Sequence, residues 1–69
     1  MTPEQTINIA NDGVQGAGSH AAVMAAALAL PPAVLRGVLD LNHVEFQGGE
    51  RKTTLARRLA NELQGNPTS

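Results

Sequence analysis

The sequence predicts an all-α protein, a small bundle of three to five short helices in one domain. A chain of 69 residues is long enough for one domain at most. The run from His20 to Leu30 is dominated by alanine, the best helix former. Between Glu50 and Leu63, leucine and alanine recur at helical spacing on one face while charged residues occupy the others.

The first 18 residues are expected to be a variable N-terminal segment and a glycine-rich connection. Thr2 stands where a helix N-cap would be, and Pro3 suits the first helical turn. Polar and apolar residues alternate over residues 6–10, however, so a short strand competes with a short helix there. Three glycines between residues 13 and 18 predict a turn before the next element.

Two prolines divide the middle of the chain into a pair of helices. Ser19 is the expected N-cap of a first helix, His20–Leu30. Pro31 disfavours helical geometry at the residue before it, yet proline is well tolerated in the first turn of a new helix. We therefore expect a second helix, Pro31–Leu41, packed at an angle to the first.

A third helix is expected over Glu50–Leu63, closing the core. Residues 43–47 alternate again and leave a short strand open as an alternative, and two glycines follow them. Gly65 is a plausible helix cap. The helical core is thus expected over residues 19–64, with a loose tail over 65–69.

No membrane segment is expected. The longest stretch without a polar side chain, Ala21–Leu35, is fifteen residues long and contains two prolines, whereas a membrane-spanning helix needs about 20. No lysine or arginine precedes this stretch, so a secretory leader is not expected either. The default prediction is a soluble cytoplasmic protein without a membrane partner.

Enzymatic chemistry is poorly represented, and neither a cofactor nor a small-molecule substrate is expected. The chain has no cysteine, and its two histidines, His20 and His43, are too far apart in sequence to form a local metal motif. The six carboxylates are scattered singly. Lys52 is followed by two threonines, as in phosphate-binding loops, but Arg51 stands where such a loop needs glycine.

Residues 25–39 resemble the helix-turn-helix of small phage-repressor-like and Cro-like regulators. In that family a small residue packs at the helix crossing, and apolar residues recur five and eight places after the hydrophobe of the turn. The resemblance covers roughly Ala21–Leu63 and implies that Ala25 is the crossing residue and Ala29 the turn residue. Leu30, Leu35 and Val38 would be the buried positions that join the two helices. It also implies duplex DNA as the partner and transcription regulation as the role.

The candidate nucleic-acid-binding residues are the basic ones. Arg36 lies on the second helix of the pair, where it would face the major groove. Four of the five positive charges fall within eight residues, and phosphates would be natural partners for such a cluster. These four are Arg51, Lys52, Arg57 and Arg58. The alternative is an exposed face of an amphipathic helix, with Glu50 and Glu62 paired along it.

A protein partner is the competing prediction. The segment Ala21–Leu30 is apolar on every side, and a helix of that kind must be covered all round. A second copy or a foreign protein could supply the cover, which describes a homodimeric inhibitor or adaptor. Val34, Val38 and Leu39 are the candidate partner-binding residues on the second helix. The sequence does not decide whether the ligand is DNA or protein. It also does not decide whether the protein is a monomer or a homodimer.

Overall fold

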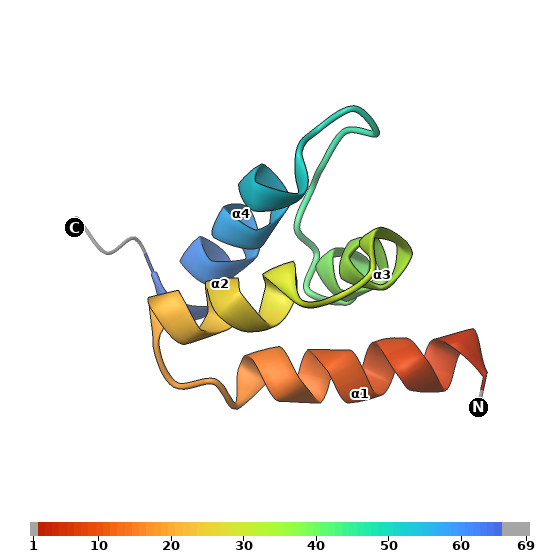
Figure 1. Ribbon diagram of the computed structural model, residues 1–69, viewed down its shortest axis with the longest axis horizontal. Coiled ribbons are helices and arrows are strands. Elements are labelled where there is room, and N and C mark those ends of the chain that lie inside the picture. The colour runs from red at the N-terminus through yellow and green to blue at the C-terminus, as the bar shows by residue number, and fades with distance from the viewer. Residues whose placement is uncertain (1, 66–69) are drawn as a thin grey trace.

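The computed structural model describes residues 2–65 and contains four helices over this range, with no strand (Figure 1). Their bounds are α1 Pro3–Gln15, α2 His20–Leu28, α3 Pro32–Leu41 and α4 Lys52–Gln64. The all-α prediction is confirmed. Residues 6–10 lie within α1, and residues 43–47 form part of the loop between α3 and α4, so neither of the two strand alternatives holds.

Helix α1 begins at a complete capping box. The Gln5 amide donates to Thr2 Oγ1 at 3.1 Å, and the Thr2 amide donates to Gln5 Oε1 at 2.9 Å. Val14, near the other end of the helix, is only 1% exposed. The helical core therefore begins at Pro3 rather than at residue 19, because a capped first turn and a buried last turn fix this segment as a helix.

The corner between α2 and α3 forms where the two prolines predicted it. Ser19 Oγ caps α2 by accepting a hydrogen bond from the Ala22 amide at 3.1 Å. The helix ends at Leu28, two residues earlier than expected. Pro31 is extended (φ −59°, ψ 149°) and serves as the N-cap residue of α3. Two separate helices consequently meet at this corner.

Helix α3 ends in a Schellman motif that carries histidine at the position usually held by glycine. The Val44 amide donates to Leu39 O at 2.9 Å, and the His43 amide donates to Asp40 O at 3.1 Å. His43 has a φ of 57°, in the left-handed region. Val44 is then carried back into the core, where it is 7% exposed. The apparent strand pattern at residues 43–47 thus belongs to a helix cap and the loop after it.

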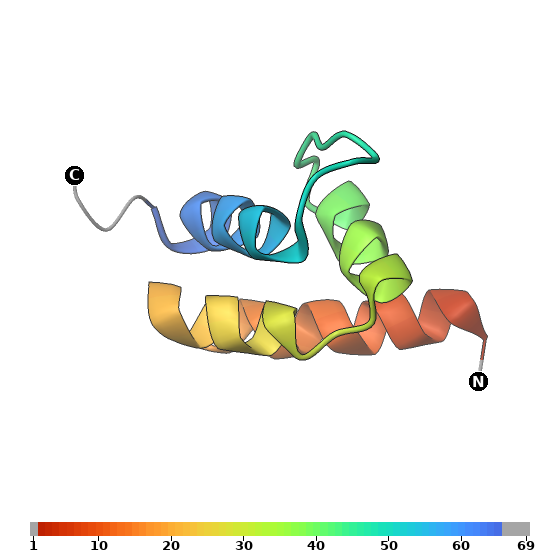
Figure 2. The same ribbon diagram turned by 45° about the horizontal axis from the view of Figure 1, so that its top comes forward.

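Two helix pairs build the core. Helix α4 runs back along α2 in the antiparallel sense, and α3 packs chiefly on α1 (Figure 2). At the end of the first pair, the His20 Nε2 and Asn61 Oδ1 atoms lie 2.7 Å apart. The buried side chains come from all four helices and the loop: Val14, Val23, Ala27, Leu35, Val38, Leu39, Val44, Leu55, Ala56, Leu59 and Ala60. No helix within residues 2–65 has the length and apolar character to cross a bilayer.

The helices α2 and α3 do not pack on each other as the helix-turn-helix resemblance implied. They make only marginal contact and are held in place by α4 and α1. Ala25, expected at the crossing, is exposed, whereas Leu35 and Val38 are buried as expected. Ala29 has ordinary helical geometry (φ −77°, ψ −12°). The corner is therefore right in position, but the expected crossing through Ala25 is absent, because α4 occupies the packing side of α2.

The crossing of α1 and α3 is close because Gly37 has no side chain. A Cβ atom at this position would lie 2.4 Å from Cδ1 and 2.8 Å from Cγ1 of Ile7. Both distances are well below van der Waals contact, so Ile7 fills the space that any larger residue would need. Asn42 ties the same pair of helices together further along, donating to Asn11 Oδ1 at 2.8 Å and accepting from Gln15 at 2.7 Å.

We expect Gly37→Ala to lower the free energy of unfolding by about 1 kcal/mol, measured by urea denaturation. Overpacking costs about 1–3 kcal/mol, and the better helix propensity of alanine offsets about 1 kcal/mol of that. In an Ile7→Ala background the collision disappears, and the same substitution should be neutral or stabilising. An equal effect of Gly37→Ala in both backgrounds would contradict the close crossing.

Candidate interaction surfaces

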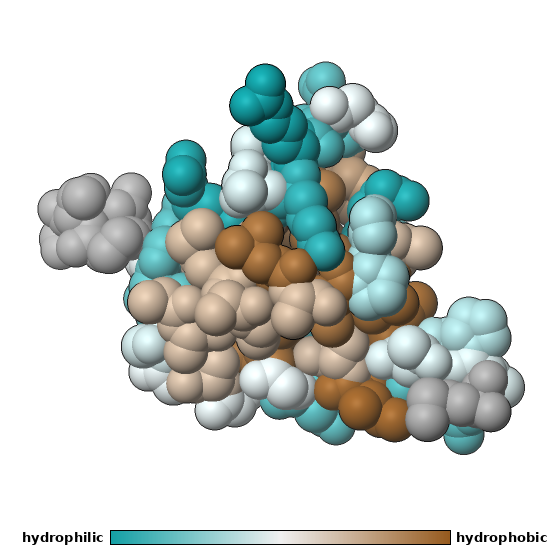
Figure 3. Space-filling model, in the orientation of Figure 1, coloured by the Kyte–Doolittle hydropathy of each residue, from teal (hydrophilic) through white to brown (hydrophobic). Residues whose placement is uncertain are grey.

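The outer side of α2 is an apolar surface that no other part of the described chain covers. We call it the α2 surface, and it consists of Ala21, Ala25, Leu28 and Ala29, all of them exposed. Leu28 is the largest of these and is 37% exposed. Figure 3 shows tan and brown atoms joined into one area at the centre of the face on which α2 lies.

The sequence of α2 explains why this surface contains no polar group. At about 100° per residue, residues 21, 25 and 28 lie on the side of the helix away from Val23 and Ala27. Those two residues have no exposed area and belong to the core. The only polar side chain of the helix, His20, is paired with Asn61 of α4. Every other residue of α2 is apolar, so whichever side α4 left open had to be apolar too.

The structure corrects the partner-binding residues predicted on α3. Val38 and Leu39 have no exposed area and lie in the core, so neither is available to a partner. Val34 is half-buried. The apolar stripe was recognised, but it faces α1 and α4 within the same chain. The apolar composition of residues 21–30 signalled the α2 surface, but the sequence did not show which side of the helix would be covered.

The predicted basic residues divide into four that carry no ion pair within residues 2–65 and one that does. Arg36, on α3, is exposed, as are Arg51 and Arg57 at α4, whereas Lys52 is half-buried. Arg58 is the exception, since it forms the one ion pair of the described residues, with Glu50. No hydrogen bond or ion pair within residues 2–65 links Arg36 to the basic residues of α4.

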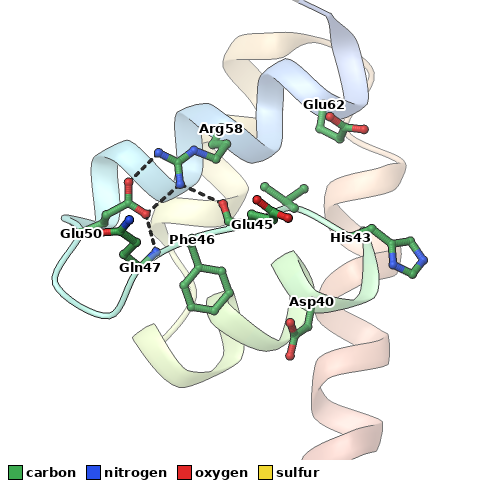
Figure 4. A pocket seen from close by; sticks show the side chains of 9 residues that line it. Asp40, His43, Glu45, Phe46, Gln47, Glu50, Arg58 and Glu62 are labelled. Carbon is green, nitrogen blue, oxygen red and sulfur yellow. Dashed lines mark hydrogen bonds and ion pairs between the residues drawn. The ribbon is translucent and has the colours of Figure 1, made fainter.

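Arg58 clamps the loop that joins α3 to α4 (Figure 4). Its Nη1 and Nη2 atoms donate to the two carboxylate oxygens of Glu50 at 2.7 and 2.5 Å. Nη1 also donates to Glu45 O at 2.9 Å, and the Gln47 amide donates to Glu50 Oε2 at 2.7 Å. Paired donors on a carboxylate fix geometry as well as charge. Arg58, predicted to bind nucleic acid, instead uses these donors within the chain.

The clamp shifts the pKa values of both partners. The hydrogen bonds from Arg58, followed by the bond from the Gln47 amide, lower the pKa of Glu50 to about 2. The hydrogen bonds with Glu50 raise the pKa of Arg58. Glu50 does form an ion pair with a residue of the basic cluster, but it lies in the loop before α4 and not along the helix face as expected. Glu62, the other carboxylate named for such pairing, has no ion pair among residues 2–65.

The clamped loop forms one wall of an open groove of about 1030 Å³. The last turns of α3 and the outer side of α4 contribute the remaining walls (Figure 4). Nine residues line it: Asp40, His43, Val44, Glu45, Phe46, Gln47, Glu50, Arg58 and Glu62. Phe46, the only aromatic residue of the protein, is half-buried here. The groove is a second surface, built without any residue of α2.

Within residues 2–65, no three histidine or acidic side chains lie close enough together to hold an ion.

Comparison with known proteins gives no match: no family model, curated protein or solved structure is significantly similar to this chain. What this protein binds must therefore be inferred from the chemistry of these surfaces.

Acid should weaken the fold through Glu50. A carboxylate whose pKa is lower in the folded state stabilises the fold above its unfolded pKa, near 4.5, and that stabilisation is lost as the pH falls toward 2. We expect the urea midpoint to fall between about pH 5 and pH 2, and Glu50→Gln to flatten this fall. Glu62→Gln removes the same charge outside the clamp, so the urea midpoint of this variant should fall with pH as steeply as that of the wild type. If both variants gave the wild-type profile, the clamp would not form in solution.

Proposed function

We propose that this protein is a small non-enzymatic binding protein that works as a homodimer, an inhibitor or adaptor assembled through the α2 surface. The observation that carries the proposal is that every exposed residue of α2 is apolar. Single exposed apolar residues are normal on protein surfaces, but a contiguous apolar area marks an interaction site. This area lies on a helix that α4 already holds on its other side.

The size of the side chains favours a helix as the covering element. Ala21 and Ala25 are one turn apart, and small residues allow helix axes to approach within about 8 Å. Leu28 and Ala29 extend the same surface to the corner before α3. A partner helix laid along this surface would bury apolar area, which is worth about 25 cal/mol per Å² removed from water.

The absence of charged residues in this segment favours a second copy of the chain as the partner that covers the α2 surface. No charged residue lies between Ala21 and Leu35, so two α2 surfaces can meet without repulsion between like charges. A two-fold axis would place each surface against its own equivalent. The core within residues 2–65 is also small, with eleven buried hydrophobic residues, and short chains often gain stability by oligomerising.

We expect wild-type protein to sediment as a dimer at micromolar concentration and Leu28→Lys to sediment as a monomer. A lysine buried within an apolar contact loses its hydration and finds no partner for its charge there. Leu41→Lys is the matched control, because Leu41 is also an exposed leucine (46%) that ends its helix. It should remain dimeric. Circular dichroism verifies that both variants fold.

Two results would overturn this function. The first is a wild-type protein that stays monomeric up to about 1 mM, the concentration range in which even weak association becomes visible. The second is equal dissociation by Leu28→Lys and Leu41→Lys, which would assign the dimer contact to another surface.

Duplex DNA is the second candidate ligand, as the helix-turn-helix resemblance implied. The observation that favours it is the absence of an ion pair at Arg36, Arg51, Lys52 and Arg57 within residues 2–65. Their charges are therefore available to phosphates. Arg58 is left out of this set because the clamp uses its donors.

If DNA is the ligand, binding measured by fluorescence anisotropy should weaken about a hundredfold between about 50 and 200 mM salt, as expected for roughly four phosphate contacts. Arg36→Ala combined with Arg57→Ala should abolish it. The variant with lysine at both positions keeps the charge and should retain the salt dependence. A duplex that does not bind at the lower salt concentration would remove this candidate.

A further inference from the structure

We propose that the groove between α3, the α3–α4 loop and α4 binds a basic peptide segment of a partner protein, with arginine or lysine side chains opposite Asp40, Glu45 and Glu62 and an apolar side chain against Phe46. This site shares no residue with the α2 surface. It therefore stands or falls independently of the homodimer.

The charge of the groove defines the ligand. Four carboxylates line it, and one of them, Glu50, is neutralised by Arg58. Asp40, Glu45 and Glu62 are exposed and have no ion pair within residues 2–65. Such a surface attracts cationic side chains and repels the phosphates of nucleic acid. A protein segment rich in arginine or lysine is the partner with the complementary charge.

The distribution of these carboxylates over different elements favours an extended ligand over a single ion. They come from three different elements: Asp40 from α3, Glu45 from the loop and Glu62 from α4. No three acidic or histidine side chains among residues 2–65 converge on one point. Separate negative charges along a groove match successive cationic side chains along a peptide, and a metal ion would need them together.

The lining of the groove adds an apolar contact to the charges. Phe46 lines the groove together with Val44 and is only half-buried, so part of its side chain remains accessible. Aromatic rings bind both the apolar stems and the charged ends of arginine and lysine. In the view of Figure 4 the Phe46 ring lies between the clamp and Asp40.

The Arg58 clamp holds the groove in shape before any ligand arrives. Four hydrogen bonds join Arg58 and Glu50 to each other and to the backbone at residues 45 and 47. The loop that presents Glu45 and Phe46 is therefore already ordered before a ligand binds. A preformed site loses less conformational entropy on binding, which raises affinity.

The test uses a blocked hexapeptide of sequence Arg-Leu-Arg-Ala-Leu-Arg and the full chain labelled with ¹⁵N. We expect its addition to shift the amide resonances of residues 40–50 and 58–62, with an affinity that falls as salt is added. Glu45→Gln combined with Glu62→Gln should weaken binding about tenfold, the effect of removing two exposed ion pairs. Glu4→Gln combined with Asp12→Asn removes the same charge from α1 and should leave binding unchanged.

Several outcomes would overturn the proposal. Equal weakening by the two double variants would mean attraction to net charge without a site. The other contrary outcomes are no binding of the basic peptide, or equal shifts caused by a peptide with glutamate in place of arginine or by duplex DNA. Leu28→Lys should bind the peptide as the wild type does, so failure of the homodimer and failure of the groove are distinguishable.

Discussion

The rest of the structure depends on the packing of α4 along one side of α2. Val23 and Ala27 have no exposed area, and Leu59 and Ala60 of α4 are equally buried in the same core. Because α4, together with a smaller contribution from α1, covers the inner side of α2, the outer side remains apolar and open. Helix α4 also supplies one wall of the groove, through Arg58 and Glu62. Both candidate surfaces therefore involve a helix that takes part in this contact.

Much of the fold could be predicted from the sequence because its signals are local. Thr2 and Ser19 cap the helices that they were expected to cap, and Pro31 turns the chain where its fixed backbone requires a turn. The predictions that were wrong concern interactions between residues distant in the sequence. Val38 and Leu39 were expected to meet a partner, but α1 and α4 bury them. The cap of α3 has a left-handed residue, His43, where glycine is usual. Because the sequence has no glycine there, the alternation of residues 43–47 was interpreted as a possible strand.

The two surfaces have different chemistry and therefore different roles in the proposed function. The α2 surface is neutral and composed of small side chains, which suits a second copy of the same helix. The groove carries negative charge around one aromatic ring, which suits a basic segment of another protein. Arg58 links the fold to the second surface, since the donors that would have served a DNA phosphate instead hold the loop in place. A homodimer with one groove per chain would act as a bivalent adaptor.

The central claim is that α2 has one side covered by α4 and one side open to solvent or to a second copy. Methyl resonances of alanine report this directly when a soluble paramagnetic chelate is added to the Leu28→Lys variant, which is expected to be monomeric. We expect the chelate to broaden the methyl signals of Ala21, Ala25 and Ala29 strongly while those of Ala27, Ala56 and Ala60 stay sharp. In the wild-type dimer the first group should be protected as well. Equal broadening of Ala25 and Ala27 in the monomeric variant would contradict the account.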